Sequence, residues 1–134
     1  MKKLSFCVIM LLTAWALQAN ETANDYTLVW SDEFDGNVLN TSVWNIEVKG
    51  DGGGNNELQY YCEKGVKVEN GNLILTATKE NYGSKHFTSG RINSKNNFYF
   101  KHGKIEASIK LPSTANGLWP AFWMMGNDYD QVGW

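Results

Sequence analysis

The segment Lys104-Ile105-Glu106-Ala107-Ser108-Ile109-Lys110-Leu111 is the clearest guide to the fold class. Its apolar residues occupy every second position, and polar residues fill the positions between them. A period of two is that of a β-strand with one face on a core and the other towards water. Pro112 ends the pattern, because proline has no N–H to donate to a strand ladder. We therefore predict a strand over 104–111.

Earlier in the chain, two further strand-like segments flank a turn signal. Val66 to Glu69 alternates apolar and polar residues, and Asn70-Gly71 follows it. This dipeptide is typical of a tight hairpin turn, because both central positions need a positive φ. Leu73, Leu75 and Ala77 then share one face of the next predicted strand. Short strands separated by closely spaced turns are typical of a β-sandwich or jelly roll.

The remaining sequence adds another β-rich segment, Tyr26 to Trp30, and no convincing helical period. Glycines interrupt the aromatic middle of the chain, and no internal repeat is present. Single-domain β-sandwiches commonly run to roughly 200–250 residues, whereas this chain has 134. The sequence therefore predicts an all-β sandwich that is incomplete in this chain.

Residues 1–19 have the features of a secretory signal peptide. Lys2 and Lys3 precede an apolar run from Leu4 to Leu12, and small residues then allow cleavage after Ala16 or Ala19. The run is too short to span a bilayer, which needs about 20 residues. We expect a secreted or periplasmic protein with no membrane span after cleavage; the alternative is a buried N-terminal helix.

The charge of the chain excludes one class of partner. Residues 1–19 hold two of the 12 basic residues and none of the 14 acidic ones, so residues 20–134 carry a net charge of −4. Nucleic-acid binding needs clustered Lys and Arg, and Arg91 is the single arginine. We expect no nucleic-acid partner. Cys62 is the one cysteine after residue 19, and we interpret it as a small semi-buried side chain.

Five segments, in order, resemble signatures of glycoside hydrolase family 16. They are Trp30–Gly36 (WSDEFDG), Asn55–Tyr61 (NNELQYY), Ser89–Ile92 (SGRI), Gly103–Ala107 (GKIEA) and Gly117–Gly126 (GLWPAFWMMG). The resemblance implies a concanavalin-like jelly roll with a glycan cleft across one sheet. It also implies a retaining endo-hydrolase of β-glucan polysaccharide. The second and fifth segments are most similar to the β-1,3-glucanase (laminarinase) branch, with mixed-linkage glucan as the alternative substrate.

The family's catalytic strand reads Glu-x-Asp-x-x-Glu, and this motif is absent from the sequence. A retaining glycosidase needs two carboxyl groups roughly 5–5.5 Å apart, one as nucleophile and one as acid and base. Residues 20–134 are thus expected to be the N-terminal part of a catalytic domain that stops before this strand, with no catalytic residues and no activity alone. The alternatives are a non-catalytic glycan-binding β-sandwich, or a fragment that does not fold stably. We expect a monomer.

Two tryptophans are the first candidates for substrate binding. A strand through Ala121 would place Trp119 and Trp123 on one face. Flat apolar rings with a polar edge suit the C–H face of a pyranose, and in the resembling family tryptophans line the cleft. We predict that at least one of them contacts glycan; the alternative is two core tryptophans.

Arg91 and Asn55 are the second pair of candidates. Five fixed donors suit Arg91 to sugar hydroxyls or carboxylates, and the alternative is a surface salt bridge. Asn55 follows the glycine-rich loop Gly50 to Gly54, and the resemblance implies that it reaches a sugar on the donor side.

No cofactor is required by the expected chemistry. The acidic cluster Asp32, Glu33 and Asp35 lies on an entry strand and its turn, so we do not expect it to be catalytic. The resemblance instead implies a structural calcium ion with backbone oxygens near Glu33 and Gly71, since calcium accepts carbonyl oxygens readily. A further ligand would lie outside this chain.

Overall fold

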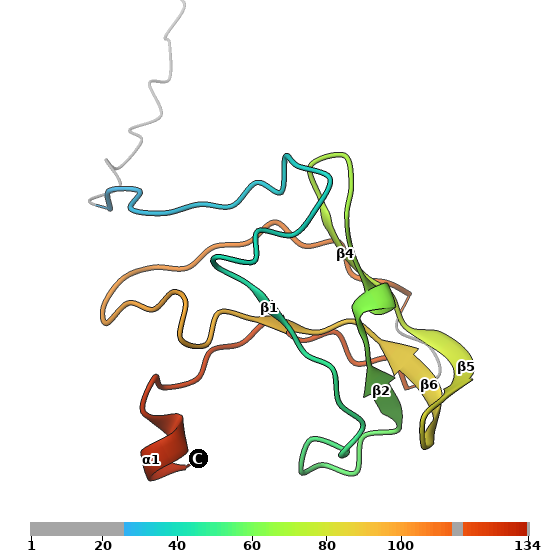
Figure 1. The fold of residues 1–134 in the computed structure, drawn as a ribbon. Coiled ribbons are helices and arrows are strands. Elements are labelled where there is room, and N and C mark those ends of the chain that lie inside the picture. The colour runs from blue at the N-terminus through green and yellow to red at the C-terminus, as the bar shows by residue number, and fades with distance from the viewer. Residues whose placement is uncertain (1–25, 114–116, 134) are drawn as a thin grey trace, which may run out of the picture.

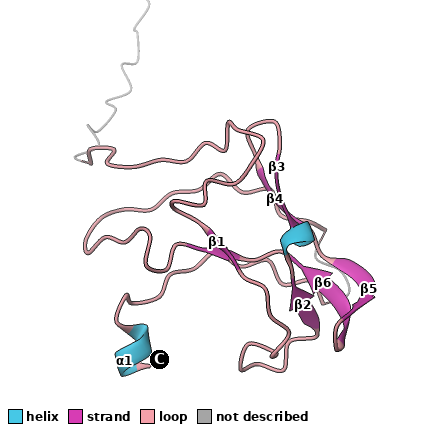
Figure 2. Cartoon of the chain, viewed as in Figure 1, coloured by secondary structure: helices cyan, strands magenta, loops and turns pink. Residues whose placement is uncertain are grey.

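The computed structural model describes residues 26–113 and 117–133, so the predicted signal peptide lies outside the described residues. The regular elements are mostly strands, with little helix, and long loops join them (Figure 2). The elements are β1 (Asn45–Ile46), β2 (Gln59–Tyr61), the 3-10 helix η1 (Glu63–Gly65), β3 (Val66–Val68), β4 (Leu73–Leu75), β5 (Thr78–Tyr82), β6 (Lys85–Ser89), β7 (Ile92–Asn93) and the short helix α1 (Tyr129–Val132). No helix in these described ranges is both long enough and apolar enough to cross a bilayer.

Strands β3 and β4 form the hairpin that the sequence predicts. They are antiparallel, with Val66 opposite Leu75 and Val68 opposite Leu73. Asn70 and Gly71 turn the chain with φ values of 52° and 70°. The positive φ at both positions matches a turn whose twist agrees with that of the flanking strands, which is why Asn-Gly is favoured there.

The stretch 85–93 is the backbone on which the site is built (Figure 1). β6 lies between β5, which is antiparallel to it, and β2, which is parallel to it. Further along the same stretch, β1 pairs with β7. An isolated antiparallel bridge between Lys49 and Tyr61 joins the two arrangements. Segments around residues 47, 61 and 91 are therefore neighbours.

A close backbone contact fixes the crossing of two of these segments. A Cβ atom added at Gly65 would lie 2.5 Å from the Gly90 nitrogen, and one added at Gly90 would overlap the Gly65 carbonyl oxygen. Both glycines are buried. Only a residue without a side chain allows this approach.

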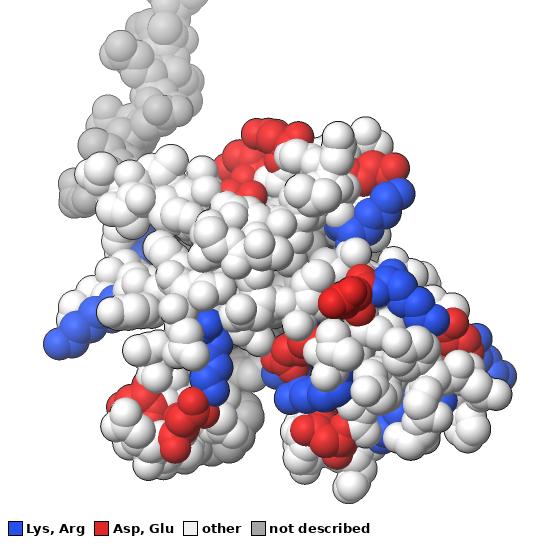
Figure 3. Space-filling view, in the orientation of Figure 1, with Lys and Arg blue, Asp and Glu red and all other residues white. Residues whose placement is uncertain are grey.

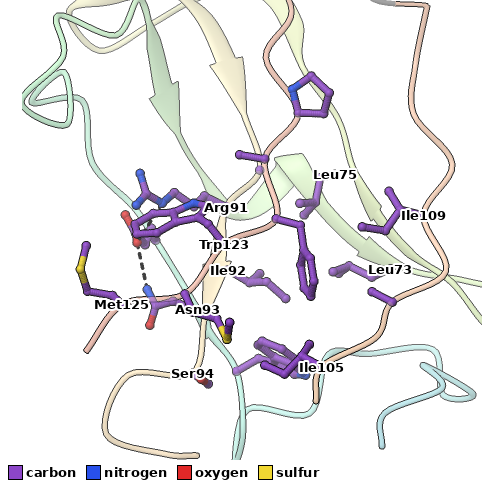
Figure 4. A pocket seen from close by; sticks show the side chains of 18 of the residues that line it. Leu73, Leu75, Arg91, Ile92, Asn93, Ser94, Ile105, Ile109, Trp123 and Met125 are labelled. Atoms are coloured by element: carbon purple, nitrogen blue, oxygen red, sulfur yellow. Dashed lines mark hydrogen bonds and ion pairs between the residues drawn. The ribbon is translucent and has the colours of Figure 1, made fainter. Parts of the chain in front are cut away.

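The interior of the described chain is small. Cys62 and Val68 are its buried hydrophobic residues, at 2% and 5% exposure, and Cys62 is a free thiol. An open hollow of about 3830 Å³ is lined by other residues of the chain. Ligand pockets are typically about 300–1,000 Å³, so the hollow is too large to be a ligand pocket. Figure 4 shows Leu73, Leu75, Ile92, Ile105 and Ile109 among the side chains that line it.

Three predicted strands are not formed. The segments 26–30, 104–111 and 119–123 carry no strand, and between residues 99 and 125 no described residue makes a backbone–backbone hydrogen bond to another. Ile105 and Ile109 point the same way (Figure 4), but every residue of 104–111 is exposed, so the predicted core face is not formed. A strand also needs a hydrogen-bonded neighbour, and the described residues provide none for these segments.

The surface reflects this open architecture. In the face shown in Figure 3, Lys, Arg, Asp and Glu form small mixed groups near the rim, around a broad uncharged centre. Many large apolar side chains are exposed, among them Leu28 at 78% and Val29 at 89%.

Candidate functional site

Arg91 is the centre of a polar cluster that lines the same hollow as Ile92. Its Nε lies 3.1 Å from Glu47 Oε1. The two residues are also backbone partners, because the Glu47 N–H donates to the Arg91 carbonyl at 2.9 Å. Asn93 Nδ2 donates to the same Glu47 oxygen at 2.9 Å. Side chains two residues apart on a strand share a face, which places Arg91 and Asn93 together over Glu47.

Two aromatic rings flank the Arg91 guanidinium. The guanidinium carbon lies 5.3 Å from the ring centroid of Tyr61 and 5.3 Å from that of Trp123. Figure 4 shows the Trp123 ring beside Arg91, with Met125 and Asn93 next to it. A guanidinium within about 6 Å of an aromatic centroid is attracted by the ring's negative face. Trp123 is 49% exposed, so part of its surface stays open to a ligand.

The Tyr61 hydroxyl extends the cluster towards a second carboxylate. It donates to Glu57 Oε2 at 2.9 Å and accepts from Gln59 Nε2 at 2.8 Å. Burial raises the pKa of the Tyr61 phenol, the Glu57 carboxylate raises it further, and Arg91 opposes the shift. The phenol is therefore held neutral as a hydrogen-bond donor over the ordinary pH range.

Amide side chains continue the cluster on its other side. Asn45 Nδ2 lies 3.2 Å from Asn93 Oδ1 and donates to the Lys95 carbonyl at 2.9 Å. Asn97 Nδ2 donates to Asn45 Oδ1 at 3.2 Å. The result is a strip of carboxylate, guanidinium, phenol and amide groups beside an exposed indole. Such a strip can exchange hydrogen bonds with several hydroxyl groups while an apolar ring covers a C–H face.

The structure brings together two of the four predicted binding residues. Arg91 and Trp123 are in contact, as described above. Trp119 is 90% exposed, and no hydrogen bond or ring contact joins it to this cluster in the described structure. Asn55 lies in the loop before β2, where its N–H donates to the Gly52 carbonyl at 3.0 Å, and its side chain is exposed.

Glu47, Tyr61 and Asn93 were not predicted as site residues. Tyr61 stands in a family signature, but nothing in the sequence alone showed that its hydroxyl meets Glu57. Asn93 lies two residues after Arg91, so the shared strand face is the signal that could have pointed to it. Glu47 is recognised only through its ion pair with Arg91. Their role depends on β1 pairing with β7 across about 48 residues, which a local pattern does not reveal.

The acidic cluster near the N-terminal end has a structural role in part. Asp32 accepts hydrogen bonds from the Phe34 N–H at 2.9 Å and from Trp44 Nε1 at 2.8 Å. Trp44 lies edge-on to Trp30, with centroids 5.9 Å apart. Asp32 therefore ties an aromatic cluster together.

The expected calcium ligands lie close to one another. A Cβ placed on Gly71 would be 3.9 Å from the Glu33 carbonyl oxygen and 4.0 Å from Asp35 Oδ1. Carbonyl and carboxylate oxygens are the donors that calcium prefers, but it takes six to eight of them. Among the described residues no group of three or more His, Cys, Asp and Glu side chains could hold a metal ion. These residues fit one side of a calcium site, and the ion stays a prediction.

The chain is similar in sequence to known β-glucan-related proteins. Residues 13–131 match the model of the family of β-glucan synthesis-associated proteins SKN1/KRE6/Sbg1. The chain is 35% identical over 131 residues to a β-glucanase of Rhodothermus marinus, covering 93% of this chain and 46% of that one. It is 40% identical over 117 residues to a glucan endo-1,3-β-glucosidase of Cryptopygus antarcticus, covering 81% of this chain and 42% of that one.

The fold is also similar to a solved structure. The laminarinase of Flavobacterium sp. UMI-01 matches with a TM-score of 0.64 and 38% sequence identity, covering 81% of this chain and 47% of that one. The predicted all-β, jelly-roll fold class is confirmed by this likeness. The chain thus spans less than half the length of each of these three relatives.

Proposed function

Since the chain belongs to the family of β-glucan synthesis-associated proteins SKN1/KRE6/Sbg1, which is related to glycoside hydrolase family 16, we propose that it is the substrate-binding part of a secreted endo-β-glucan hydrolase. The ligand is a β-1,3-linked or mixed-linkage glucan. The names of two relatives, a β-glucanase and a glucan endo-1,3-β-glucosidase, support this assignment. The signal-peptide features of residues 1–19 support export.

One observation carries the proposal: Trp123 lies over Arg91 at the edge of a strip of polar side chains. An exposed indole covers the C–H face of a glucose unit. The neighbouring guanidinium and amide groups donate to its hydroxyls, and Glu47 and Glu57 accept from them. Glu47 and Arg91 lie next to the paired strands β1 and β7, and Asn93 lies within β7, so these three groups are near one another before a ligand arrives. Trp123 lies in a segment without a strand and meets the cluster at Arg91.

We propose that the groups that carry out hydrolysis are not among the residues of this sequence. Retaining hydrolysis needs a nucleophilic carboxylate and a second carboxyl group that first donates and later accepts a proton. The sequence holds no Glu-x-Asp-x-x-Glu segment. We propose that this chain binds and orients β-glucan and does not cleave it unaided.

The test measures binding and cleavage separately on the same purified chain. Titration with a β-1,3-linked glucose oligosaccharide should quench tryptophan fluorescence, and a β-1,4-linked oligosaccharide of equal length is the control. Reducing ends released from β-1,3-glucan should stay at the level of a protein-free blank. Binding to neither oligosaccharide would overturn the glucan assignment, and released reducing ends would overturn the division between binding and catalysis.

The second candidate function is glycan binding without any catalytic partner. The absent carboxylate motif favours it, and the matched family is described as β-glucan synthesis-associated. The two candidates differ in the sequence that follows Trp134 in the gene. A Glu-x-Asp-x-x-Glu strand there supports the hydrolase, and its absence supports the binding protein.

A further inference from the structure

Glu47 makes more polar contacts than any other carboxylate of the site. Its side chain is 16% exposed. Oε1 meets Arg91 Nε at 3.1 Å and Asn93 Nδ2 at 2.9 Å. Oε2 lies 3.1 Å from Lys49 Nζ, in an ion pair whose alignment does not make a hydrogen bond. Donors thus approach this carboxylate from Lys49, two residues further along the chain, and from Arg91 and Asn93 at β7.

We propose that Glu47 is a positioning residue, which holds the Arg91 guanidinium between Tyr61 and Trp123 so that the Trp123 ring keeps the orientation needed to receive a sugar. This inference rests on the proposed function. It adds to that function the residue on which the geometry of the aromatic platform depends. Glu47 acts through Arg91 and does not itself need to touch the glucan.

The geometry of Arg91 supports this role. Its side chain is 25% exposed, and a free arginine side chain has many rotamers to lose on ordering. The Glu47 carboxylate takes the Nε donor, which fixes the plane of the guanidinium fork. The guanidinium carbon lies 5.3 Å from both aromatic centroids. The terminal N–H groups point away from Nε, and they remain for the Tyr61 hydroxyl and for a ligand.

No neighbouring group can replace the Glu47 carboxylate. Lys49 and Arg91 are both cations, so loss of the carboxylate leaves two like charges beside each other. Glu57 is engaged by the Tyr61 hydroxyl and Gln59. Removing one partner of a part-buried ion pair leaves the other charge without compensation. Arg91 would then turn towards water and leave the Trp123 ring.

The test replaces Glu47 by Gln, which keeps the shape and removes the charge, and by Asp, which keeps the charge on a shorter arm. The matched control is Glu69→Gln, which breaks the exposed Lys67–Glu69 pair at 2.9 Å. The first readout needs no ligand: nitrogen-resolved NMR of the Arg91 Nε–H and of the Trp123 indole N–H. We expect both signals to shift and the Arg91 signal to exchange faster with water in Glu47→Gln, with partial recovery in Glu47→Asp.

The second readout is affinity for a β-1,3-linked glucose oligosaccharide. We expect about a tenfold loss in Glu47→Gln and no change in Glu69→Gln. Thermal melting of each variant shows whether it remains folded. Unchanged Arg91 and Trp123 signals in a folded Glu47→Gln variant would overturn the positioning role. Failure of the unsubstituted chain to bind the oligosaccharide would overturn the proposed function alone, because the ligand-free NMR comparison still decides the role of Glu47.

Discussion

Glu47 and Arg91 are joined twice, once through the backbone and once through their side chains. The Glu47 N–H donates to the Arg91 carbonyl at 2.9 Å, while the Arg91 Nε lies 3.1 Å from the Glu47 carboxylate. The backbone bond places the two residues opposite each other, and the ion pair then fixes the direction of the arginine side chain. This double link makes the surroundings of Arg91 the most constrained part of the site.

Arg91→Lys should weaken glucan binding although it keeps the positive charge. Lysine is a compact cation without a planar fork, so it cannot serve Glu47 and lie flat against two rings at once. We expect about a tenfold loss in affinity for a β-1,3-linked oligosaccharide, measured by fluorescence titration. Lys95→Arg is the control, because it exchanges one cation for another at the exposed pair with Asp130. Equal affinity of Arg91→Lys and the unsubstituted chain would contradict the role of the fork.

Trp123→Ala should reduce binding more than Trp119→Ala does. Trp123 contacts Arg91, whereas Trp119 is 90% exposed and makes no hydrogen bond or ring contact with the described residues of the cluster. An aromatic contact contributes about 0.5–1.5 kcal/mol of interaction free energy beyond that of the area it buries. Titration calorimetry of both variants with the same oligosaccharide gives the comparison. A larger loss in Trp119→Ala would move the platform to Trp119.

Gly90→Ala should destabilise the chain because the new methyl group overlaps the Gly65 carbonyl oxygen. We expect a loss of about 2–3 kcal/mol in the free energy of unfolding, measured by urea denaturation. Gly36→Ala is the matched control, since its Cβ would lie 3.6 Å from the nearest atom, the Val38 carbonyl oxygen. Similar urea midpoints for the two variants would show that this backbone contact can relax.

Stability should fall at high pH through Tyr61. Burial and Glu57 raise the pKa of its phenol above the ordinary value of 10.0. The folded state therefore favours the protonated phenol. The resulting stability is fully present below pH 10 and is lost as the pH rises through the raised pKa. Absorbance at the phenolate band should show a late-ionising component, and Tyr61→Phe should abolish it; its persistence in Tyr61→Phe would contradict the assignment.

The hollow should bind a hydrophobic dye and release it when a complementary apolar surface is supplied. We expect the dye ANS to fluoresce with the purified chain, because apolar side chains such as Leu73 and Ile109 face open space. A polypeptide carrying the part of a laminarinase relative beyond the matched segment should lower this signal, and a scrambled version should not. No difference between the two polypeptides would contradict a complementary apolar fit.

Local patterns predicted local structure well. The Asn70-Gly71 turn and its hairpin follow from residues that are adjacent in sequence, and both are confirmed. The alternation in 104–111 also predicted that Ile105 and Ile109 point the same way. Its pairing could not be predicted, because a ladder requires a second segment whose position depends on the rest of the fold.

Sequence patterns did not reveal the contacts of the site that are non-local. Arg91 and Trp123 were recognisable as residue types suited to sugars, and they are in contact. Glu47 was not, because its importance arises from pairing between strands that are far apart in sequence. Trp119 and Trp123 looked equivalent as a pair two residues apart, and only the three-dimensional position of Arg91 separates them.

The distance along the chain between the paired strands has a consequence for the order of folding. β3 with β4, and β5 with β6, are hairpins of neighbouring segments, and such structures form in microseconds. β1 and β7 instead close a loop of 48 residues between Asn45 and Asn93, and entropy slows such long-range closure. The polar strip is therefore assembled late, after the hairpins exist. A nascent chain would remain unable to recognise sugar until its slowest contact has formed, so recovery of ligand binding during refolding reports the completion of the fold.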